Sequence, residues 1–211
     1  MTPIPDFLKC LFSTFDQSAI HDFRAFLALN PGNTKWQLAA DFCLHDKDRP
    51  NNVFAFTLIP YDDYLANLNS EISKAIPKDI KKTTDIKEEC LSFLRDTRRY
   101  HFGFVVKGSP KYFYNGEGSN PLAIARESLD LMLKQLVDNG RSEENIKKLK
   151  MLIQAAKAKR FNVELFGDLL MLINLFCFIT LVLARERQVE ILGWFPDRDC
   201  MTTWCDGVVW D

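Results

Sequence analysis

The strongest constraint on the fold is a 20-residue apolar run at positions 165–184. The run, LFGDLLMLINLFCFITLVLA, is about as long as a membrane-spanning helix. However, Asp168 and Asn174 lie inside it, and a carboxylate in hydrocarbon costs roughly 2.5–3.5 kcal/mol. Basic residues flank both ends of the run and therefore indicate no membrane orientation. They are Lys157, Lys159 and Arg160 before it and Arg185 and Arg187 after it. We therefore expect a buried core helix, with a membrane helix and an oligomer interface as the alternatives.

The charge balance restricts how the chain can bind nucleic acid. It carries 27 basic and 28 acidic residues, a formal net charge of -1. This balance excludes binding of nucleic acid through a large overall positive charge. It also excludes a disordered chain with a large excess of acidic residues. A nucleic-acid site must then be a local patch, for which the basic stretches KDIKK, RDTRRY and KAKR are candidates. Solvated surface is the alternative interpretation of each stretch.

The cysteines and the N-terminal residues predict a cytoplasmic protein. None of the six cysteines forms a C-x-x-C pair, and no histidine lies near Cys200 and Cys205 to complete a zinc site. Free thiols are typical of a reducing compartment. The N-terminus lacks a basic start, and Pro3, Pro5 and Asp6 interrupt its apolar residues, unlike a secretory signal.

Alternation of apolar and polar side chains predicts four β-strands. Residues 35–44, KWQLAADFCL, have one apolar face and an opposite face that carries Asp41, which predicts a largely buried strand. We expect residues 53–61 to pair with it as an antiparallel strand. Two further strands are expected at 100–108 and 189–195.

Apolar residues at helical spacing predict that helices form much of the remaining chain. They are expected within residues 6–29, 62–76, 85–97, 121–139, 142–160 and 163–187. Ser119 or Asn120 is a suitable N-cap before Pro121, and Gly140 is a suitable end for the helix that follows.

No internal repeat and no linker rich in glycine and proline divides the chain. We therefore expect a single α/β domain over residues 1–211, in which helices flank a mixed β-sheet. A helical N-terminal extension at 1–30 would precede a core over 35–211. The 17 phenylalanines indicate a large aromatic core.

Four aspartates lie in unusually apolar surroundings. Asp197, Asp199 and Asp206 belong to the C-terminal segment GWFPDRDCMTTWCDGVVWD, and Asp41 lies within a strand. Burial of a carboxylate such as Asp41 requires a compensating partner. Structural alternatives are a turn at Asp197, a helix cap at Asp199, and ion pairs at Asp206 and Asp41.

These acids would form a cation site if the fold brought them together. Mg²⁺ and Mn²⁺ prefer several hard oxygen ligands, which carboxylates supply. Two such ions about 4 Å apart can activate a water and stabilise the leaving oxygen in phosphodiester cleavage. The four aspartates are therefore candidate metal ligands and catalytic residues.

The order of the expected strands and helices resembles that of the ribonuclease H-like superfamily. The resemblance is carried by the segments KWQLAADFCLHDKDRPNNVFAFTLIPYDDYLANLNSEISKAI and YHFGFVVKG. They resemble in particular a bacterial family of uncharacterised ribonuclease H-like proteins. The resemblance covers roughly residues 35–210. It implies that Asp41 is the first-strand acid, Asp197 or Asp199 the late-strand acid, and Asp206 the late-helix acid.

Two features depart from that family's pattern. The family has acid, acid, serine and glycine together in its first motif, whereas Asp41 is followed by FCLHD. The middle acid on a helix has no clear counterpart, and Glu127 and Asp130 are the remaining candidates.

The resemblance implies a metal-dependent phosphodiesterase or nuclease that acts on nucleic acid with Mg²⁺ or Mn²⁺. Its ligands would be Asp41, Asp197, Asp199 and Asp206, with water as the nucleophile. One alternative is a non-catalytic interaction or accessory protein of the same fold. Another is a protein attached to a membrane through residues 165–184.

Overall fold

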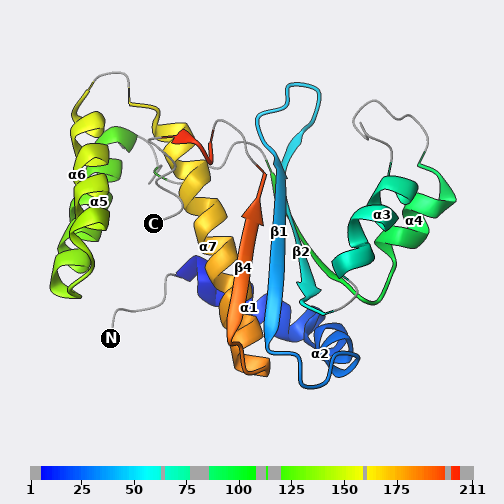
Figure 1. The fold of residues 1–211 in the computed structure, drawn as a ribbon. Coiled ribbons are helices and arrows are strands. Elements are labelled where there is room, and N and C mark those ends of the chain that lie inside the picture. Colours follow the sequence, from blue (N-terminus) through cyan, green and yellow to red (C-terminus); the bar gives the residue numbers. More distant parts are fainter. Residues whose placement is uncertain are drawn as a thin grey trace. The chain divides into compact units, whose positions relative to one another are not determined.

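The computed structural model describes residues 6–62, 65–76, 86–107, 113, 120–158, 161–197 and 201–204 (Figure 1). Within them the chain is an α/β protein with a four-stranded mixed sheet and seven helices, which confirms the expected fold class at this level. The helices are α1 (Asp6–Ser18), α2 (Ile20–Ala28), α3 (Leu65–Ala75), α4 (Glu88–Leu94), α5 (Pro121–Asp138), α6 (Glu143–Lys157) and α7 (Val163–Glu186). The strands are β1 (Lys35–Cys43), β2 (Asn51–Pro60), β3 (Tyr100–Lys107) and β4 (Ile191–Pro196).

The sheet has the strand order β3-β2-β1-β4. The backbone N–H of Tyr61, just after β2, donates to the Lys35 carbonyl at the start of β1 (2.8 Å), so these two strands are antiparallel as expected. The N–H groups of Glu190 and Ile191 donate to the Thr34 carbonyl (2.8 and 3.3 Å), so β4 and β1 begin side by side and run parallel. The strand that carries Asp41 is therefore the neighbour of the last strand.

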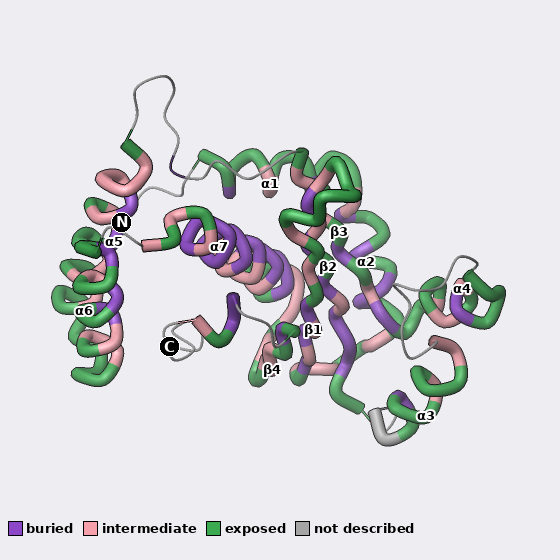
Figure 2. Tube along the Cα trace, turned by 90° about the horizontal axis from the view of Figure 1, so that it is seen from above, coloured by how far each residue is buried: buried purple, intermediate pink, exposed green. Residues whose placement is uncertain are grey.

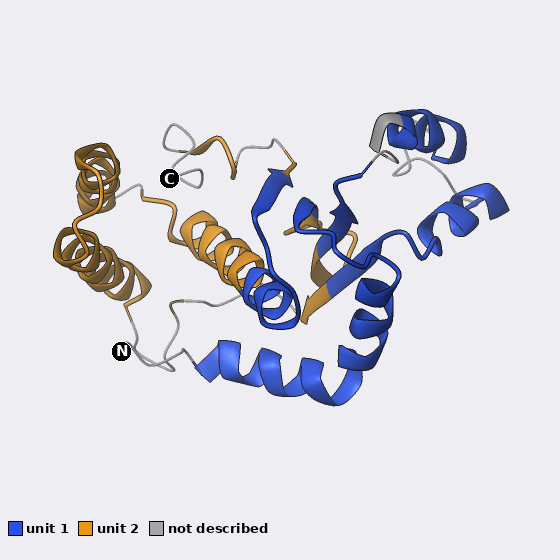
Figure 3. Cartoon of the chain, turned by 60° about the horizontal axis from the view of Figure 1, so that its bottom comes forward, with its two compact units in different colours: residues 1–41, 55–103, 178–195 blue, residues 42–54, 104–177, 196–211 orange. Residues whose placement is uncertain are grey.

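The chain divides into two compact units (Figure 3). Unit 1 consists of residues 1–41, 55–103 and 178–195, and unit 2 consists of residues 42–54, 104–177 and 196–211. Unit 1 contains α1–α4 and most of the strand residues. Unit 2 contains α5, α6 and the first part of α7.

The core of unit 1 is built from aromatic side chains, as the phenylalanine content predicts. The ring of Phe15 lies 5.7 Å from that of Phe23 and 5.8 Å from that of Phe178. Phe23 also contacts Tyr100 at 5.0 Å, and Phe26 contacts Trp36 at 5.9 Å. These edge-on and tilted contacts join α1, α2, β1, β3 and the C-terminal part of α7.

The core of unit 2 is helical. Ala125 and Leu129 of α5, Leu152 of α6 and Phe166 of α7 belong to one buried cluster. The Asn120 side chain accepts a hydrogen bond from the Ala123 N–H, with Pro121 in the first turn, which confirms the expected start of α5. Such caps satisfy backbone donors that the helix itself leaves unpaired.

Helix α7 contains the long apolar run and is largely buried (Figure 2). Its 24 residues, and a mean hydropathy of 2.3 over its most apolar window, suffice by length and composition to cross a membrane, but 61% of that window is buried inside the protein. Side chains with 2% exposure or less occur at both ends, for example Phe166 and Leu183. This burial agrees with the expectation of a core helix.

The charged C-terminal turn of α7 is paired within unit 1. The Arg185 guanidinium donates to both oxygens of Asp16 (2.6 and 3.1 Å), and the Glu186 carboxylate accepts from Arg24 (2.8 and 3.1 Å). The hydrogen bond from Arg185 lowers the pKa of the Asp16 carboxyl, and the hydrogen bond from Arg24 lowers the pKa of Glu186. The basic residues at this end of α7 therefore have protein partners.

Candidate functional site

A buried carboxylate interrupts the apolar surface of α7 within unit 2. The side chain of Asp168 is only 2% exposed, and its Oδ2 lies 2.6 Å from Nε2 of His45. Its other oxygen, Oδ1, is buried and has no hydrogen-bond partner among the described residues. Burial raises the pKa of Asp168, an effect that His45 partly offsets and Glu164 reinforces.

His45 lies in the loop after β1, where both its backbone and its side chain contact other residues. Its φ of 54° lies in the left-handed region, which is uncommon for a residue other than glycine. Its backbone N–H donates to Oδ1 of the buried Asn52 on β2 (2.7 Å). Its Nδ1 lies 3.5 Å from Oε1 of Glu164, so the imidazole has a carboxylate near each nitrogen. We call His45, Asn52, Glu164 and Asp168 the His45 cluster.

The His45 cluster has the geometry of a proton-transfer group. A buried acceptor fixes the orientation of the imidazole, and an imidazole ring can both accept and donate a proton. The His45 side chain is 35% exposed, so solvent and solutes reach it, whereas Asp168 is inaccessible. An oriented, accessible imidazole of this kind can act as a general acid or base.

Replacing His45 by alanine is expected to destabilise unit 2 by about 2 kcal/mol near neutral pH, because Asp168 loses its hydrogen-bond partner while it is still buried. Without His45 the pKa of Asp168 rises further. The folded protein then holds the carboxyl proton more tightly than the unfolded chain, so the penalty shrinks as the pH falls toward about 4. Urea unfolding of His45→Ala between these pH values measures the change.

Asp168→Asn provides the control for this experiment, because it keeps the shape of the side chain and removes its charge. In that background His45→Ala is expected to cost less than it does in the wild type, and the loss is expected to be nearly independent of pH. Equal costs in both backgrounds would show that His45 and Asp168 are not coupled.

The structure corrects the expectation that Asp41 is buried. The apolar face of β1 is covered at Trp36, Leu38 and Ala40, but Asp41 lies on the other face and is exposed. Its carboxylate therefore needs no buried cation to offset desolvation.

The C-terminal acids are described only in part. Asp197 directly follows β4 and is exposed, and its carbonyl accepts a hydrogen bond from Oγ1 of Thr202 (2.9 Å). Asp199 and Asp206 lie outside the described residues. Within the described ranges, no three histidine, cysteine, aspartate or glutamate side chains are arranged to hold a metal ion. Glu127 and Asp130, the candidates for a middle acid, are exposed on α5.

In one candidate phosphate-binding stretch, arginine side chains form ion pairs with carboxylates of the protein. In RDTRRY, Arg98 contacts both Asp96 and Glu71, and Arg99 is buried with its guanidinium 3.1 Å from Asp96. The hydrogen bonds from Arg98 lower the pKa of Asp96. The stretch KDIKK and the end of KAKR lie outside the described residues. RDTRRY is therefore a structural ion-pair network within unit 1.

The sequence interpretation missed the His45 cluster. Asp168 was visible as a carboxylate inside an apolar run, a signal that it requires a buried partner. The partner lies 123 residues away along the chain, and no local spacing connects the two. Comparison of the chain with protein-family models, with curated proteins and with solved structures gave no match.

Proposed function

We propose that the chain is a metal-dependent phosphodiesterase or nuclease of ribonuclease H-like architecture. The observation that carries this proposal is the strand order β3-β2-β1-β4, in which β4 runs parallel to β1. Parallel strands direct their carboxyl ends to the same edge of a sheet, where α/β proteins bind ligands. Asp41 lies near that end of β1, and Asp197 follows the last residue of β4.

Asp41, Asp197, Asp199 and Asp206 are the proposed ligands for one or two Mg²⁺ or Mn²⁺ ions. Their oxygens are the hard donors that these ions prefer, and Asp41 and Asp197 are exposed to solvent. The bound ions would lower the pKa of an attacking water and neutralise charge on the phosphate. The proposed substrate is nucleic acid, held by a local basic patch, since the net charge is only -1.

His45 is the proposed proton-transfer residue of this reaction. It follows Asp41 by four positions in the sequence, and the buried Asp168 fixes its ring. A neutral imidazole there would accept the proton of the attacking water, and an imidazolium would donate one to the leaving oxygen. This role makes use of the accessible ring of His45, which a purely structural ion pair would not require.

A non-catalytic interaction protein of the same fold is the second candidate function. The exposure of three large apolar side chains on the α5–α6 pair favours it: Leu131 is 57% exposed, Val137 54% and Met151 56%. Large apolar side chains that are exposed in this way are available for contact with a protein partner. A protein that is attached to a membrane through α7 is a third candidate, favoured by the mean hydropathy of 2.3 over the most apolar window of that helix.

Mn²⁺ is expected to raise the stability of the wild type by about 2.7 kcal/mol when its concentration is a hundred times the dissociation constant. Asp41→Asn is expected to keep the fold and to lose this response, because a carboxamide is a weaker ligand than a carboxylate. Thermal unfolding of both proteins in Mn²⁺ and in a chelator measures the shift.

Asp48→Asn is the matched control, since Asp48 is an exposed aspartate in the loop that follows β1. Its melting temperature should respond to Mn²⁺ as the wild type does. If Mn²⁺ shifts neither the wild type nor Asp41→Asn, or shifts both equally, Asp41 is not a metal ligand. The four aspartates would then have structural roles only, as a turn residue, a helix cap and members of ion pairs.

A further inference from the structure

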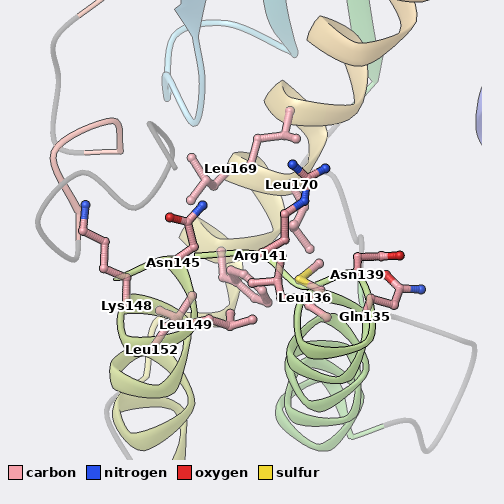
Figure 4. A pocket seen from close by; sticks show the side chains of 13 residues that line it. Gln135, Leu136, Asn139, Arg141, Asn145, Lys148, Leu149, Leu152, Leu169 and Leu170 are labelled. Atoms are coloured by element: carbon pink, nitrogen blue, oxygen red, sulfur yellow. The ribbon is translucent and has the colours of Figure 1, made fainter. Parts of the chain in front are cut away.

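Helices α5 and α6 and the first part of α7 border a cavity of about 410 Å³ within unit 2 (Figure 4). Small-molecule sites typically measure roughly 300–1,000 Å³. The cavity reaches the hydrophobic core of the unit at Leu149, Leu152, Phe166 and Leu170, none of which is more than 8% exposed. Apolar walls of this kind offer water few hydrogen bonds, so the transfer of an apolar group from water into the cavity is favourable.

The charged side chains that line the cavity are both cations. Arg141 comes from the turn between α5 and α6, and Lys148 comes from α6 (Figure 4). Lys148 Nζ lies 3.8 Å from the exposed carboxylate of Glu144, which does not line the cavity. In the part of the chain that the structure describes, no carboxylate pairs with the Arg141 guanidinium. The charge at this cavity therefore complements an anion.

The backbone fixes the position of Arg141. Gly140 adopts a φ of 61°, a conformation that glycine allows without strain, and its N–H donates to the Val137 carbonyl (3.0 Å). The N–H of Arg141 donates to the Leu136 carbonyl (3.0 Å), and Ser142 then caps α6. This turn holds Arg141 beside the cavity without using its side chain, so the guanidinium is available to a ligand.

We propose that this cavity binds a single-chain amphiphile with a carboxylate head group, of the fatty-acid class. The apolar tail occupies the space against Leu149, Leu152, Phe166 and Leu170, and the carboxylate pairs with Arg141. A guanidinium matches a carboxylate through two parallel hydrogen bonds, which an alcohol or an ammonium head group does not reproduce. The proposal concerns unit 2 alone and does not depend on nuclease activity.

Isothermal titration of the full chain with dodecanoate below its micelle concentration tests this site. The wild type is expected to bind one dodecanoate, and to bind dodecyltrimethylammonium, which has the same tail and a cationic head, at least about tenfold more weakly. Arg141→Ala is expected to weaken dodecanoate binding about tenfold, which corresponds to about 1.4 kcal/mol. Lys150→Ala removes an exposed positive charge from α6 outside the cavity and should change the affinity less than twofold.

A second variant tests the place of the tail. Ile173 lines the cavity and is half-buried, so Ile173→Trp is expected to fill the space and abolish dodecanoate binding while the protein remains folded. Circular dichroism confirms folding of each variant. Dodecanoate binding that survives in both Arg141→Ala and Ile173→Trp would overturn the proposal, as would equal affinity for the two amphiphiles or no binding of dodecanoate by the wild type.

Discussion

Asp41→Asn is expected to lower metal-dependent phosphodiesterase activity at least about 100-fold. Loss of a group that only supports a metal ligand typically costs about 10–100-fold, so loss of a ligand itself should cost no less. The fold should persist, because Asp41 is exposed and its replacement opens no cavity. The measurement is the rate of cleavage of single- and double-stranded DNA and RNA with Mg²⁺ or Mn²⁺, compared with the rate in a chelator.

The control and the pH profile separate catalysis from structure in this experiment. Asp48→Asn, which changes a nearby exposed aspartate, should retain wild-type activity. His45→Ala should lower the rate and change its pH dependence, because the proposed proton-transfer group is then absent. Metal-dependent cleavage that is equal in the wild type and Asp41→Asn would contradict the assignment of Asp41. No cleavage of any of the four substrates by the wild type would favour the non-catalytic interaction protein.

Leu183→Ala is expected to lower the free energy of unfolding by about 2–5 kcal/mol, the usual range for a buried leucine replaced by alanine. Leu183 lies in α7 and is 0% exposed. Leu181 is two positions earlier in the same helix but is 49% exposed, so Leu181→Ala should cost less than about 1 kcal/mol. Guanidinium unfolding followed by tryptophan fluorescence compares the two variants.

This pair of leucines distinguishes a core helix from a membrane helix. In lipid the apolar surroundings would cover both side chains, so the two variants should differ little. In a core the difference should be large, and the wild type should purify from the cytosolic fraction without detergent. Recovery of the protein only from the membrane fraction, or equal costs at Leu181 and Leu183, would contradict the assignment of α7 as a core helix.

Local sequence patterns were sufficient to predict most of the elements. The alternation in residues 35–44 predicted β1, which spans Lys35–Cys43, and the apolar run predicted α7, which ends at Glu186. The Asn120 cap and the turn at Gly140 were also predictable, because both depend on the backbone chemistry of a few neighbouring residues. Ser18, which lies just before α2, does not cap that helix: α1 continues through it, and its hydroxyl donates to the Thr14 carbonyl.

Local patterns along the chain were therefore enough to predict the α/β class, the strand and helix positions, and the presence of unusual carboxylates in apolar segments. Which of these carboxylates are buried could be seen only in the folded protein, because the burial of a side chain depends on what packs against its face. Alternation shows that Asp41 and Trp36 lie on opposite faces of β1, but the neighbouring elements cover the face of Trp36 and leave Asp41 exposed. Asp168 is buried because other parts of the protein cover its position on α7. Its partner His45 can be identified only in the folded protein, since the two residues are 123 positions apart in the sequence.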